Sequence, residues 1–339
     1  MPVNKIQSRR TILQTIAKGS LAASLAPMTM LAACDDRTNK DGSSVGASIA
    51  MQAAWVNDAE FIGYFVAQNG SLYAKEGVNL SYLAGGPEIV ADTVVLARKA
   101  DIALTTPDTT ISAIVNQGAR VKIIGAQYQK NPLGIVSLQK NHIDTLSDLK
   151  GRTLAVPPAN VISVQSILKL NRIASDAVRI VPYQYDPTPL IRGEVDATVD
   201  FVTDVPYAIR QLGVEPSSFL LYDYGFKIFN DTVVVLEDTL QTKRDSLVKW
   251  LRASRRGWEE NFKDPTRYPK LFANSFFRGN GRTAANEIFM NQAQKPLIEN
   301  ASGIFSMSEQ AIELNIEALN RMGIKATASM FVTDLLKEV

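Results

Sequence analysis

The most constraining feature of this 339-residue chain is a regular alternation of two patterns between residues 49 and 236. Short runs rich in β-branched residues are separated by longer amphipathic or capped segments, which is typical of an α/β fold with mostly parallel sheets. The motif Thr106-Pro107-Asp108 places Pro in the first turn of a helix, and Gly118 is expected to end that helix. The predicted strands are 49–56, 78–84, 101–105, 121–128, 153–156, 178–184, 196–201 and 232–236.

After Glu237 the alternation stops and helical patterns follow one another. We expect helices at 238–262, 265–276, 283–294 and 308–322, with no strand among them. The C-terminal third is therefore predicted to be helical. No segment is long and apolar enough to cross a membrane.

The chain contains one His and one Cys, which removes most side-chain metal sites, Ser-His-Asp and Cys-His catalysis, and any disulfide framework. Carboxylates remain for metals, but no Asp-x-Asp-x-Asp-Gly loop is present. The 36 Lys and Arg residues balance 34 Asp and Glu residues, and no basic run marks a nucleic-acid footprint. These counts exclude many kinds of catalysis and most metal sites and disfavour nucleic-acid binding. Together with the family resemblance described below, they lead us to expect a protein that is not an enzyme, has no cofactor or metal, and binds no nucleic acid.

The first 34 residues have the pattern of an export signal. The paired Arg9-Arg10 precedes a short, Ala-rich apolar stretch at 16–31. The paired arginines resemble a twin-arginine signal, although Ile12 and Gln14 depart from its usual pattern. Export by the general secretory route stays open.

The apolar stretch ends in Leu31-Ala32-Ala33-Cys34, which resembles a bacterial lipobox. The resemblance implies cleavage before Cys34 and lipid attachment to it, whereas the alternative is a buried free Cys in a helix. The polar run at 35–44 is typical of a tether. We therefore expect a signal peptide at 1–33, a lipidated tether at 34–47, and an exported protein anchored to the bacterial membrane, facing the periplasm or the cell exterior.

Several motifs carry a family resemblance. They are the stretch from Trp55 to Phe65 (WVNDAEFIGYF), Tyr73-Ala74-Lys75-Glu76-Gly77-Val78, Gly85-Gly86-Pro87, Ala100-Asp101-Ile102-Ala103, Gln127-Tyr128-Gln129-Lys130-Asn131-Pro132, Asp148-Leu149-Lys150-Gly151-Arg152-Thr153 and Gly193-Glu194-Val195-Asp196-Ala197. In this order they resemble ABC-importer substrate-binding proteins of the thiamine-pyrimidine-precursor, riboflavin and alkanesulfonate group. The resemblance covers about residues 50 to 240 and the helical tail only loosely.

This resemblance implies a type II periplasmic-binding-protein fold, in which two α/β lobes surround a ligand cleft and the chain crosses between them twice. We place the crossings near Val136 and Asp231, so that lobe one comprises 48–136 and 232–339 and lobe two comprises 137–231. Ligands of open α/β sheets lie beyond the carboxyl ends of the strands, so loops from both lobes are expected to line the cleft.

Candidate ligand-binding residues in lobe one follow three of its predicted strands. Phe61 and Tyr64 are three residues apart on a helix and can share a face toward the cleft, although aromatic residues at this spacing are often core. Asn57 and Asp58 lie at a strand-to-helix turn and can also cap the helix, as can Thr106 and Asp108. The candidates are Trp55, Asn57, Phe61, Tyr64, Thr106, Asp108, Gln127, Tyr128 and Asn131.

Candidates in lobe two are Asn160, Tyr185, Asp186, Asp200, Phe201 and Asp204. For Asp204 the alternative is that it caps the helix that begins near Pro206 and does nothing more. Asp200 with Asp204 could also form a catalytic carboxylate pair, although nothing nearby supplies a partner. The loops at 105–110, 157–163, 185–189 and 200–204 contain four Asp residues and no Lys or Arg. Carboxylates with aromatic rings suit a flat ring that donates N–H or O–H groups.

The sequence therefore predicts a monomeric solute-binding protein that captures a small heterocyclic nutrient, such as a thiamine pyrimidine precursor or a riboflavin-like molecule, and delivers it to an ABC permease. One alternative is an alkanesulfonate, taurine or nitrate binder of the same fold, because helix N-termini can also bind anions. The alternative from another class is an exported pyrimidine-synthase-like enzyme. Such enzymes use a Cys-rich segment and histidines with iron, and this chain has neither.

Overall fold

The computed structural model of the protein describes residues 46–339. The expected signal peptide, its paired arginines, Cys34 and most of the tether lie outside the described residues. Among the residues that are described, no helix has both the length and the apolar character needed to cross a membrane.

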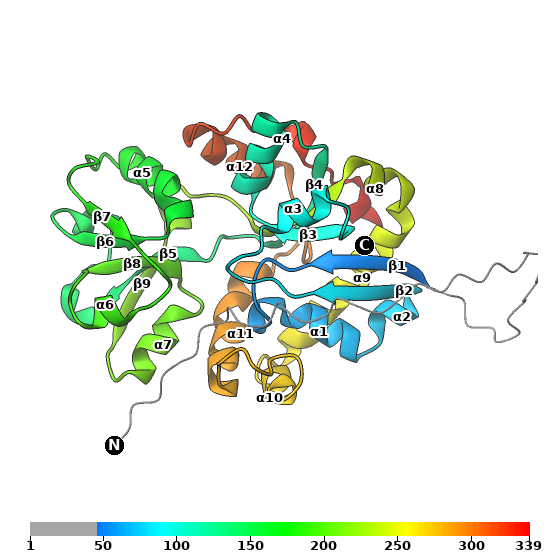
Figure 1. The fold of residues 1–339 in the computed structure, drawn as a ribbon, viewed down its shortest axis with the longest axis horizontal. Coiled ribbons are helices and arrows are strands. Elements are labelled where there is room, and N and C mark those ends of the chain that lie inside the picture. The colour runs from blue at the N-terminus through cyan, green and yellow to red at the C-terminus, as the bar shows by residue number, and fades with distance from the viewer. Residues whose placement is uncertain (1–45) are drawn as a thin grey trace, which may run out of the picture. The chain divides into compact units, whose positions relative to one another are not determined.

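Two five-stranded sheets form the framework of the described chain (Figure 1). The strand order is β2-β1-β3-β10-β4 in the first sheet and β7-β6-β8-β5-β9 in the second. The strands of the first sheet are β1 (Ala47–Gln52), β2 (Val78–Leu83), β3 (Ile102–Thr105), β4 (Val121–Tyr128) and β10 (Asn230–Leu236). Those of the second are β5 (Leu133–Leu138), β6 (Thr153–Val156), β7 (Arg179–Pro182), β8 (Ala197–Phe201) and β9 (Pro216–Leu220).

Each sheet contains one reversed strand, and in each case it is the strand that the chain forms first after leaving the other sheet. The chain leaves β4 and enters β5 through residues 129–132, and it returns from β9 to β10 through residues 221–229. β5 runs antiparallel to β8 and β9, and β10 runs antiparallel to β3 and β4. Val136, where we placed the first crossing, lies inside β5, and Asp231 is the second residue of β10.

All eight predicted strands are confirmed, and the ranges 121–128 and 153–156 match β4 and β6 to the residue. The sequence analysis missed β5 and β9. β5 follows β4 after only four residues, so its apolar run was taken as part of a crossing. β9 begins with Pro216-Ser217-Ser218, which has low strand propensity and is tolerated because β9 is an edge strand.

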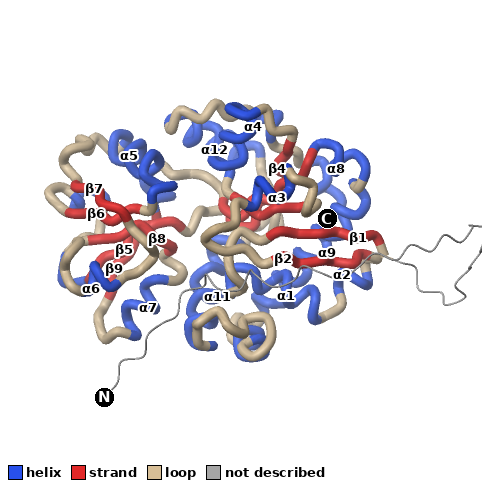
Figure 2. The backbone as a smooth tube through the Cα atoms, in the orientation of Figure 1, coloured by secondary structure: helices blue, strands red, loops and turns tan. Residues whose placement is uncertain are grey.

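Helices fill the connections between the strands and form most of the chain after β10, where the described residues contain no further strand (Figure 2). The expected helix at 238–262 is two helices that meet at Lys243. The first helices are α1 (Ile62–Asn69), α2 (Leu72–Lys75), α3 (Ala91–Leu96), α4 (Pro107–Gln117), α5 (Val161–Leu170), α6 (Thr188–Ile191) and α7 (Val205–Gln211). The remaining ones are α8 (Glu237–Thr242), α9 (Arg244–Lys263), α10 (Arg267–Phe272), α11 (Ala284–Ile298) and α12 (Glu309–Arg321).

Short 3-10 helices connect several of these elements. They are η1 (Ala59–Phe61), η2 (Gln139–Asn141), η3 (Leu146–Leu149), η4 (Pro158–Asn160), η5 (Leu221–Tyr224), η6 (Ala328–Met330) and η7 (Asp334–Glu338).

Both faces of the first sheet are covered, which explains why its strands are continuous apolar runs. In β10, Val233 and Val235 belong to one buried cluster, and Val234 and Leu236 belong to another on the opposite face. The cluster that holds Val234 continues through Phe229 into Ile135 of β5. One apolar core therefore runs from the first sheet to the second along the crossing segments.

Helices α1 and α9 pack closely because each contributes a glycine to the contact. A Cβ added at Gly63 would overlap the ring of Trp258. A Cβ added at Gly257 would overlap the carbonyl oxygen of Gly63 and lie 2.7 Å from the Cβ of Ala67. Backbone atoms cannot move aside at this contact, so the helices themselves would have to separate.

Gly257→Ala is therefore expected to lower the free energy of unfolding by about 1–3 kcal/mol, the usual range for overpacking. Chemical denaturation followed by circular dichroism measures the change. Gln68→Ala, at an exposed position of α1, is the control and should stay within about 0.5 kcal/mol of the parent. Equal stability of Gly257→Ala and the parent would contradict the close helix contact.

Candidate functional site

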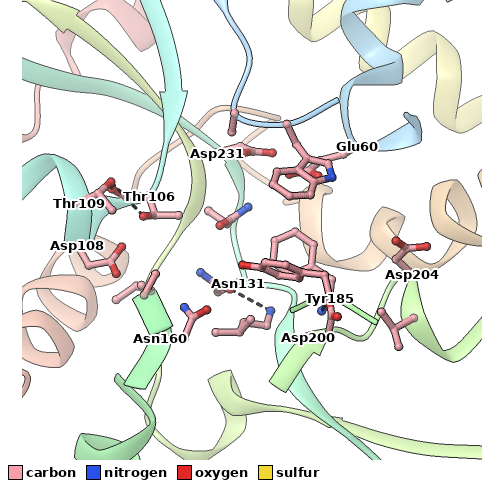
Figure 3. Close-up of a pocket in the computed structure, with 18 of the residues that line it drawn as sticks. Glu60, Thr106, Asp108, Thr109, Asn131, Asn160, Tyr185, Asp200, Asp204 and Asp231 are labelled. Atoms are coloured by element: carbon pink, nitrogen blue, oxygen red, sulfur yellow. Dashed lines mark hydrogen bonds between the residues drawn. The ribbon is translucent and has the colours of Figure 1, made fainter. Parts of the chain in front are cut away.

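A cavity of about 440 Å³ lies between the edges of the two sheets (Figure 3). The first sheet contributes loops that follow β1 and β3, and the second contributes loops that follow β6, β7 and β8. The amino ends of β5 and β10 reach the same edges because these strands are reversed, and they contribute Asn131, Leu133, Asn230 and Asp231. The cavity wall is thus formed by the carboxyl ends of β1, β3, β6, β7 and β8 and by the amino ends of the two reversed strands.

The loop after β1 supplies Trp55, Asp58 and Glu60 to the cavity wall. Asp58 caps η1, because its Oδ1 accepts a hydrogen bond of 2.9 Å from the backbone N–H of Glu60. The anticipated capping role of Asp58 is confirmed, and the same side chain also lines the cavity.

The start of α4 is held in place by the buried carboxylate of Asp92. Its two oxygens accept hydrogen bonds from the hydroxyls of Thr105, Thr109 and Thr110, at 2.8, 3.1 and 2.7 Å. This arrangement presents Thr106 and Asp108 to the cavity. The Oδ1 atom of Asp108 is buried and accepts no hydrogen bond from residues 46–339, and burial raises the pKa of this carboxyl.

The second sheet supplies Asn160, Tyr185, Asp200 and Phe201. The ring of Tyr185 lies 5.7 Å from the ring of Trp55, so an aromatic contact joins the loops that follow β7 and β1. Tyr185 has φ +59°, a left-handed conformation that costs free energy for a residue with a Cβ. Strain of this kind is common where a side chain must point into a binding site.

Six carboxyl groups line the cavity, and none of the lining residues is Lys or Arg. Burial raises the pKa of Asp200 to about 7. Burial also raises the pKa values of Asp58 and Glu60 well above their usual range, with repulsion from neighbouring carboxyls adding to the effect. The carboxyls are those of Asp58, Glu60, Asp108, Asp200, Asp204 and Asp231.

Arg282 lies behind this wall and joins elements of the two sheets. Its guanidinium forms two hydrogen bonds of 2.7 Å with the carboxylate of Asp204, which precedes α7. Its Nε donates to Glu287 of α11 at 2.8 Å. Glu287, which is 1% exposed, also accepts from the backbone N–H of Ala59 at 2.7 Å. The bridge therefore fixes the loop that carries Asp58 and Glu60.

The structure brings nine of the fifteen proposed ligand-binding residues to the cavity. Asn131 is one of these, but its side chain is engaged: its Nδ2 donates to the Phe229 carbonyl at 3.1 Å and its Oδ1 accepts from the Leu133 N–H at 2.9 Å. The nine are Trp55, Thr106, Asp108, Asn131, Asn160, Tyr185, Asp200, Phe201 and Asp204.

The three other aromatic candidates lie in the core, which corrects the expectation that they face the cleft. Phe61 and Tyr64 are fully buried, and Tyr64 stacks on Trp250 at 5.7 Å. The hydroxyl of Tyr128 donates to Gln294 at 2.6 Å. The cause is packing: helices α9 and α11, far along the chain, cover the face that these rings present.

The polar candidates Asn57, Gln127 and Asp186 also lie outside the cavity lining. Gln127 is fully buried, and its Nε2 donates to the backbone carbonyl of Glu60 and to Asp231. Asp186 accepts from the backbone N–H of Thr188 at a turn, and the carbonyl of Asn57 accepts from Asn280. The side chains of Gln127 and Asp186 thus hold backbone or neighbouring side chains in place, and Asn57 is bonded through its backbone carbonyl.

Sequence reasoning missed Asn230 and Asp231 because it searched only the carboxyl ends of strands, and it passed over Glu60 in the loop after β1 although it proposed Asp58 and Phe61 there. Asp231 was noted as a crossing point, but the reversal of β10 was not foreseen. One available signal was Glu60 itself, an isolated acidic residue in the otherwise apolar stretch Ala59-Glu60-Phe61-Ile62.

The carboxyl groups do not form a metal centre. Within residues 46–339, no group of three or more His, Cys, Asp or Glu side chains is arranged to hold a metal ion. The single His of the chain, His142, is exposed and lies outside the cavity lining.

The fold is that of periplasmic binding proteins. The periplasmic aliphatic sulphonate binding protein SsuA from Escherichia coli superposes with a TM-score of 0.64 at 13% identity, covering 86% of this chain and 97% of SsuA. The same fold also carries an enzyme: the desulfurization enzyme DSZB superposes with a TM-score of 0.56 at 12% identity, over 86% of this chain and 98% of DSZB. At these identities the similarity concerns the fold alone.

The chain belongs to the NMT1/THI5-like family, whose profile matches residues 58–268. The chain is also 21% identical over 222 residues to the riboflavin-binding protein RibY of Chloroflexus aurantiacus. That match covers 64% of this chain and 63% of the length of RibY. The suspected family is confirmed.

Replacing Arg282 tests the bridge between Asp204 and Glu287. Arg282→Ala leaves the buried Glu287 carboxylate without its cation, so we expect the free energy of unfolding to fall by about 2–3 kcal/mol. Denaturant titration measures the loss. Arg278→Ala, an Arg of the same segment that is exposed, is the matched control. Equal losses in the two variants would show that the bridge does not stabilise the fold.

Asp200 makes the stability depend on pH with a definite sign. Between the ordinary Asp pKa of about 4 and a folded-state pKa of about 7, the folded protein keeps this proton and the unfolded chain loses it. The free energy of unfolding therefore falls as pH rises through this window, by about 1.4 kcal/mol per pH unit for each such group.

Asp200→Asn cannot titrate and keeps an oxygen for the Phe201 N–H, so its fall in stability from pH 5 to pH 7 should be about 2 kcal/mol smaller than that of the parent. Denaturation at a series of pH values measures the slope. Asp176→Asn, at an exposed position, should keep the parent slope. A steeper or unchanged slope for Asp200→Asn would refute the assignment.

Proposed function

We propose that this protein is the extracytoplasmic solute-binding component of an ABC importer, which captures a small heterocyclic nutrient and delivers it to a membrane permease. The observation that carries the proposal is the cavity between the sheets, which combines Trp55 and Tyr185 with six carboxyls and no Lys or Arg. Its volume of about 440 Å³ is in the range of small-molecule sites.

The chemistry of the wall favours a ring that donates hydrogen bonds. Carboxylates accept N–H and O–H groups, and aromatic side chains cover the flat faces of a ring. A thiamine pyrimidine precursor or a riboflavin-like molecule has this character. RibY, a relative described as riboflavin-binding, supports the same class of ligand.

An alkanesulfonate, taurine or nitrate ligand fits this wall less well, even though SsuA shares the fold. A buried anion needs cations or free N–H donors, and the guanidinium of Arg282 behind the cavity wall is paired with Asp204 and Glu287. The charge of the cavity therefore weighs against an anion.

The remaining parts of the proposal follow from the same role. We propose one lobe built on each sheet, hinged at the two crossings, a monomeric protein, and a membrane anchor through lipid on Cys34. We also propose that the protein has no catalytic activity, since the single His lies outside the cavity lining.

Ligand-induced stabilisation tests the proposal. The purified protein is stripped of ligand by denaturation and refolding, then melted with aminopyrimidines, riboflavin, taurine or nitrate. A ligand at about 100 times its Kd stabilises by about 2.7 kcal/mol, which raises the melting temperature by a few degrees. We expect this shift with a heterocycle. A shift with taurine or nitrate alone would overturn the proposed ligand class.

Trp55→Ala should weaken binding of the responding heterocycle at least about tenfold, since truncating an aromatic anchor of a binding site costs more than about 1.4 kcal/mol. Isothermal titration calorimetry measures the Kd. Leu271→Ala, which removes an exposed side chain on α10 outside the cavity lining, is the control and should leave the Kd unchanged. Unchanged affinity in Trp55→Ala would place the ligand elsewhere.

A further inference from the structure

Two of the carboxyl groups that line the cavity are almost fully buried and influence each other electrostatically. Glu60 of η1 and Asp231 of β10 are 4% and 1% exposed. Burial raises the pKa of Asp231 to about 7 and that of Glu60 well above its usual range, and repulsion from the Asp231 carboxyl adds to the rise for Glu60. Both line the cavity, and both are labelled in Figure 3. Gln127 fixes the pair, because its Nε2 donates to the Asp231 carboxylate at 3.0 Å and to the Glu60 carbonyl at 2.8 Å.

The backbone of Asp231 adopts a conformation that is unfavourable for a residue with a side chain. Asp231 has φ +46° within a strand, where residues with a Cβ normally have negative φ. Such a conformation costs about 1–3 kcal/mol and persists only where the surroundings impose it. Asp231 and Tyr185 are the two residues of the cavity lining, glycines aside, that adopt positive φ in the described chain.

No cation of the described chain neutralises this pair. Neither Glu60 nor Asp231 forms an ion pair with a Lys or Arg of residues 46–339, and Arg282 is occupied by Asp204 and Glu287. Asp58 beside them is 2% exposed, and its second oxygen accepts no hydrogen bond within the same residues. The charged and titratable groups that face the pair are Asp58, Asp204, Arg282, Tyr64, Tyr82 and Tyr128.

We infer that the recognition group of the ligand is a planar nitrogen cation, of the amidinium or protonated aminopyrimidine type, which binds against Glu60 and Asp231. This inference rests on the proposed function and names the charge and donor pattern of the ligand. A planar cation with two N–H groups can form a bidentate pair with a carboxylate, with two parallel N–H···O hydrogen bonds, as the guanidinium of Arg does. Its ring would lie against Trp55, where the positive charge also gains from the aromatic face.

The proton of the pair gives the inference a second consequence. Without ligand, the two carboxyls share one proton and carry one negative charge. When the cation binds, its N–H groups replace the shared proton, which passes to the solvent, and two carboxylates then face one positive charge. Burial raises the pKa values of both carboxyls, so the proton is present near neutral pH and is available for release.

Three probes of one shape test the charge preference: benzamidine, which is a cation at neutral pH, neutral benzamide and anionic benzoate. Calorimetric titration of the purified protein should show at least about tenfold tighter binding of benzamidine than of benzamide, and no binding of benzoate. Equal or tighter binding of benzamide or benzoate would overturn the inference.

The variant Glu60→Gln keeps the size of the side chain and removes its charge. We expect it to lower the benzamidine affinity at least about tenfold and so to remove the preference for benzamidine over benzamide. Glu88→Gln, at an exposed position outside the cavity lining, is the matched control and should bind all three probes as the parent does. A Glu60→Gln protein that keeps the parent preference for benzamidine would refute the role of the pair.

Proton release is measured with benzamidine in two buffers of different ionisation enthalpy at pH 7. The parent should release up to one proton per ligand, and Glu60→Gln should release fewer. Release that is zero, or equal in the two proteins, would overturn the inference. The proposed function has its own test: it is refuted when neither an aminopyrimidine nor riboflavin stabilises the protein. If a heterocycle binds but the probes show no charge preference, only the inference of a cationic ligand is refuted.

Discussion

The side-chain amide of Asn131 joins the two segments that run between the sheets. It donates to the Phe229 carbonyl in the returning segment and accepts from the Leu133 N–H at the start of β5. Phe229 is in turn held by Asn315 of α12, whose Oδ1 accepts from its N–H at 2.8 Å. The cavity depends on these bonds, because they set where the reversed strands β5 and β10 begin. The amino ends of both strands form part of its wall.

Charge is the second constraint on the site. Six carboxyls surround a cavity whose lining contains no Lys or Arg, and the nearby Arg282 is bonded to two carboxylates. Burial of carboxyls is unfavourable unless they are protonated, hydrogen-bonded or paired with a cation. Glu60 and Asp231 rely on protonation and hydrogen bonding, whereas Asp204 is paired with the cation of Arg282. This distribution connects the fold to the ligand class that we propose, since five of the six cavity carboxyls form no ion pair with a Lys or Arg of the described residues.

Local pattern was sufficient for the strands and helices that have strong periodicity or clear caps. β4, β6 and the Pro107 start of α4 were predicted to the residue, and Gly118 ends α4 in the left-handed conformation expected of it. The missed strands, β5 and β9, lack a local signal: one continues directly from a crossing, and the other begins with Pro216 at a sheet edge. Among the site residues, Trp55 and Tyr185 follow strands and Asp200 lies at the carboxyl end of β8; these strand ends meet at the cavity, so position along the chain was enough to find the three residues.

The sequence by itself determined the α/β class, the helical C-terminal region and the family, because these depend on residue patterns within short segments. Only the tertiary structure decided that Tyr64 packs on Trp250 while Trp55 faces the cavity, and that Glu60 meets Asp231 across 171 positions of the chain. The physical reason is the same in each case. A side chain's surroundings are set by elements remote in sequence, here α9 for Tyr64 and the reversed strand β10 for Glu60, and no local pattern encodes the direction in which a strand enters a sheet.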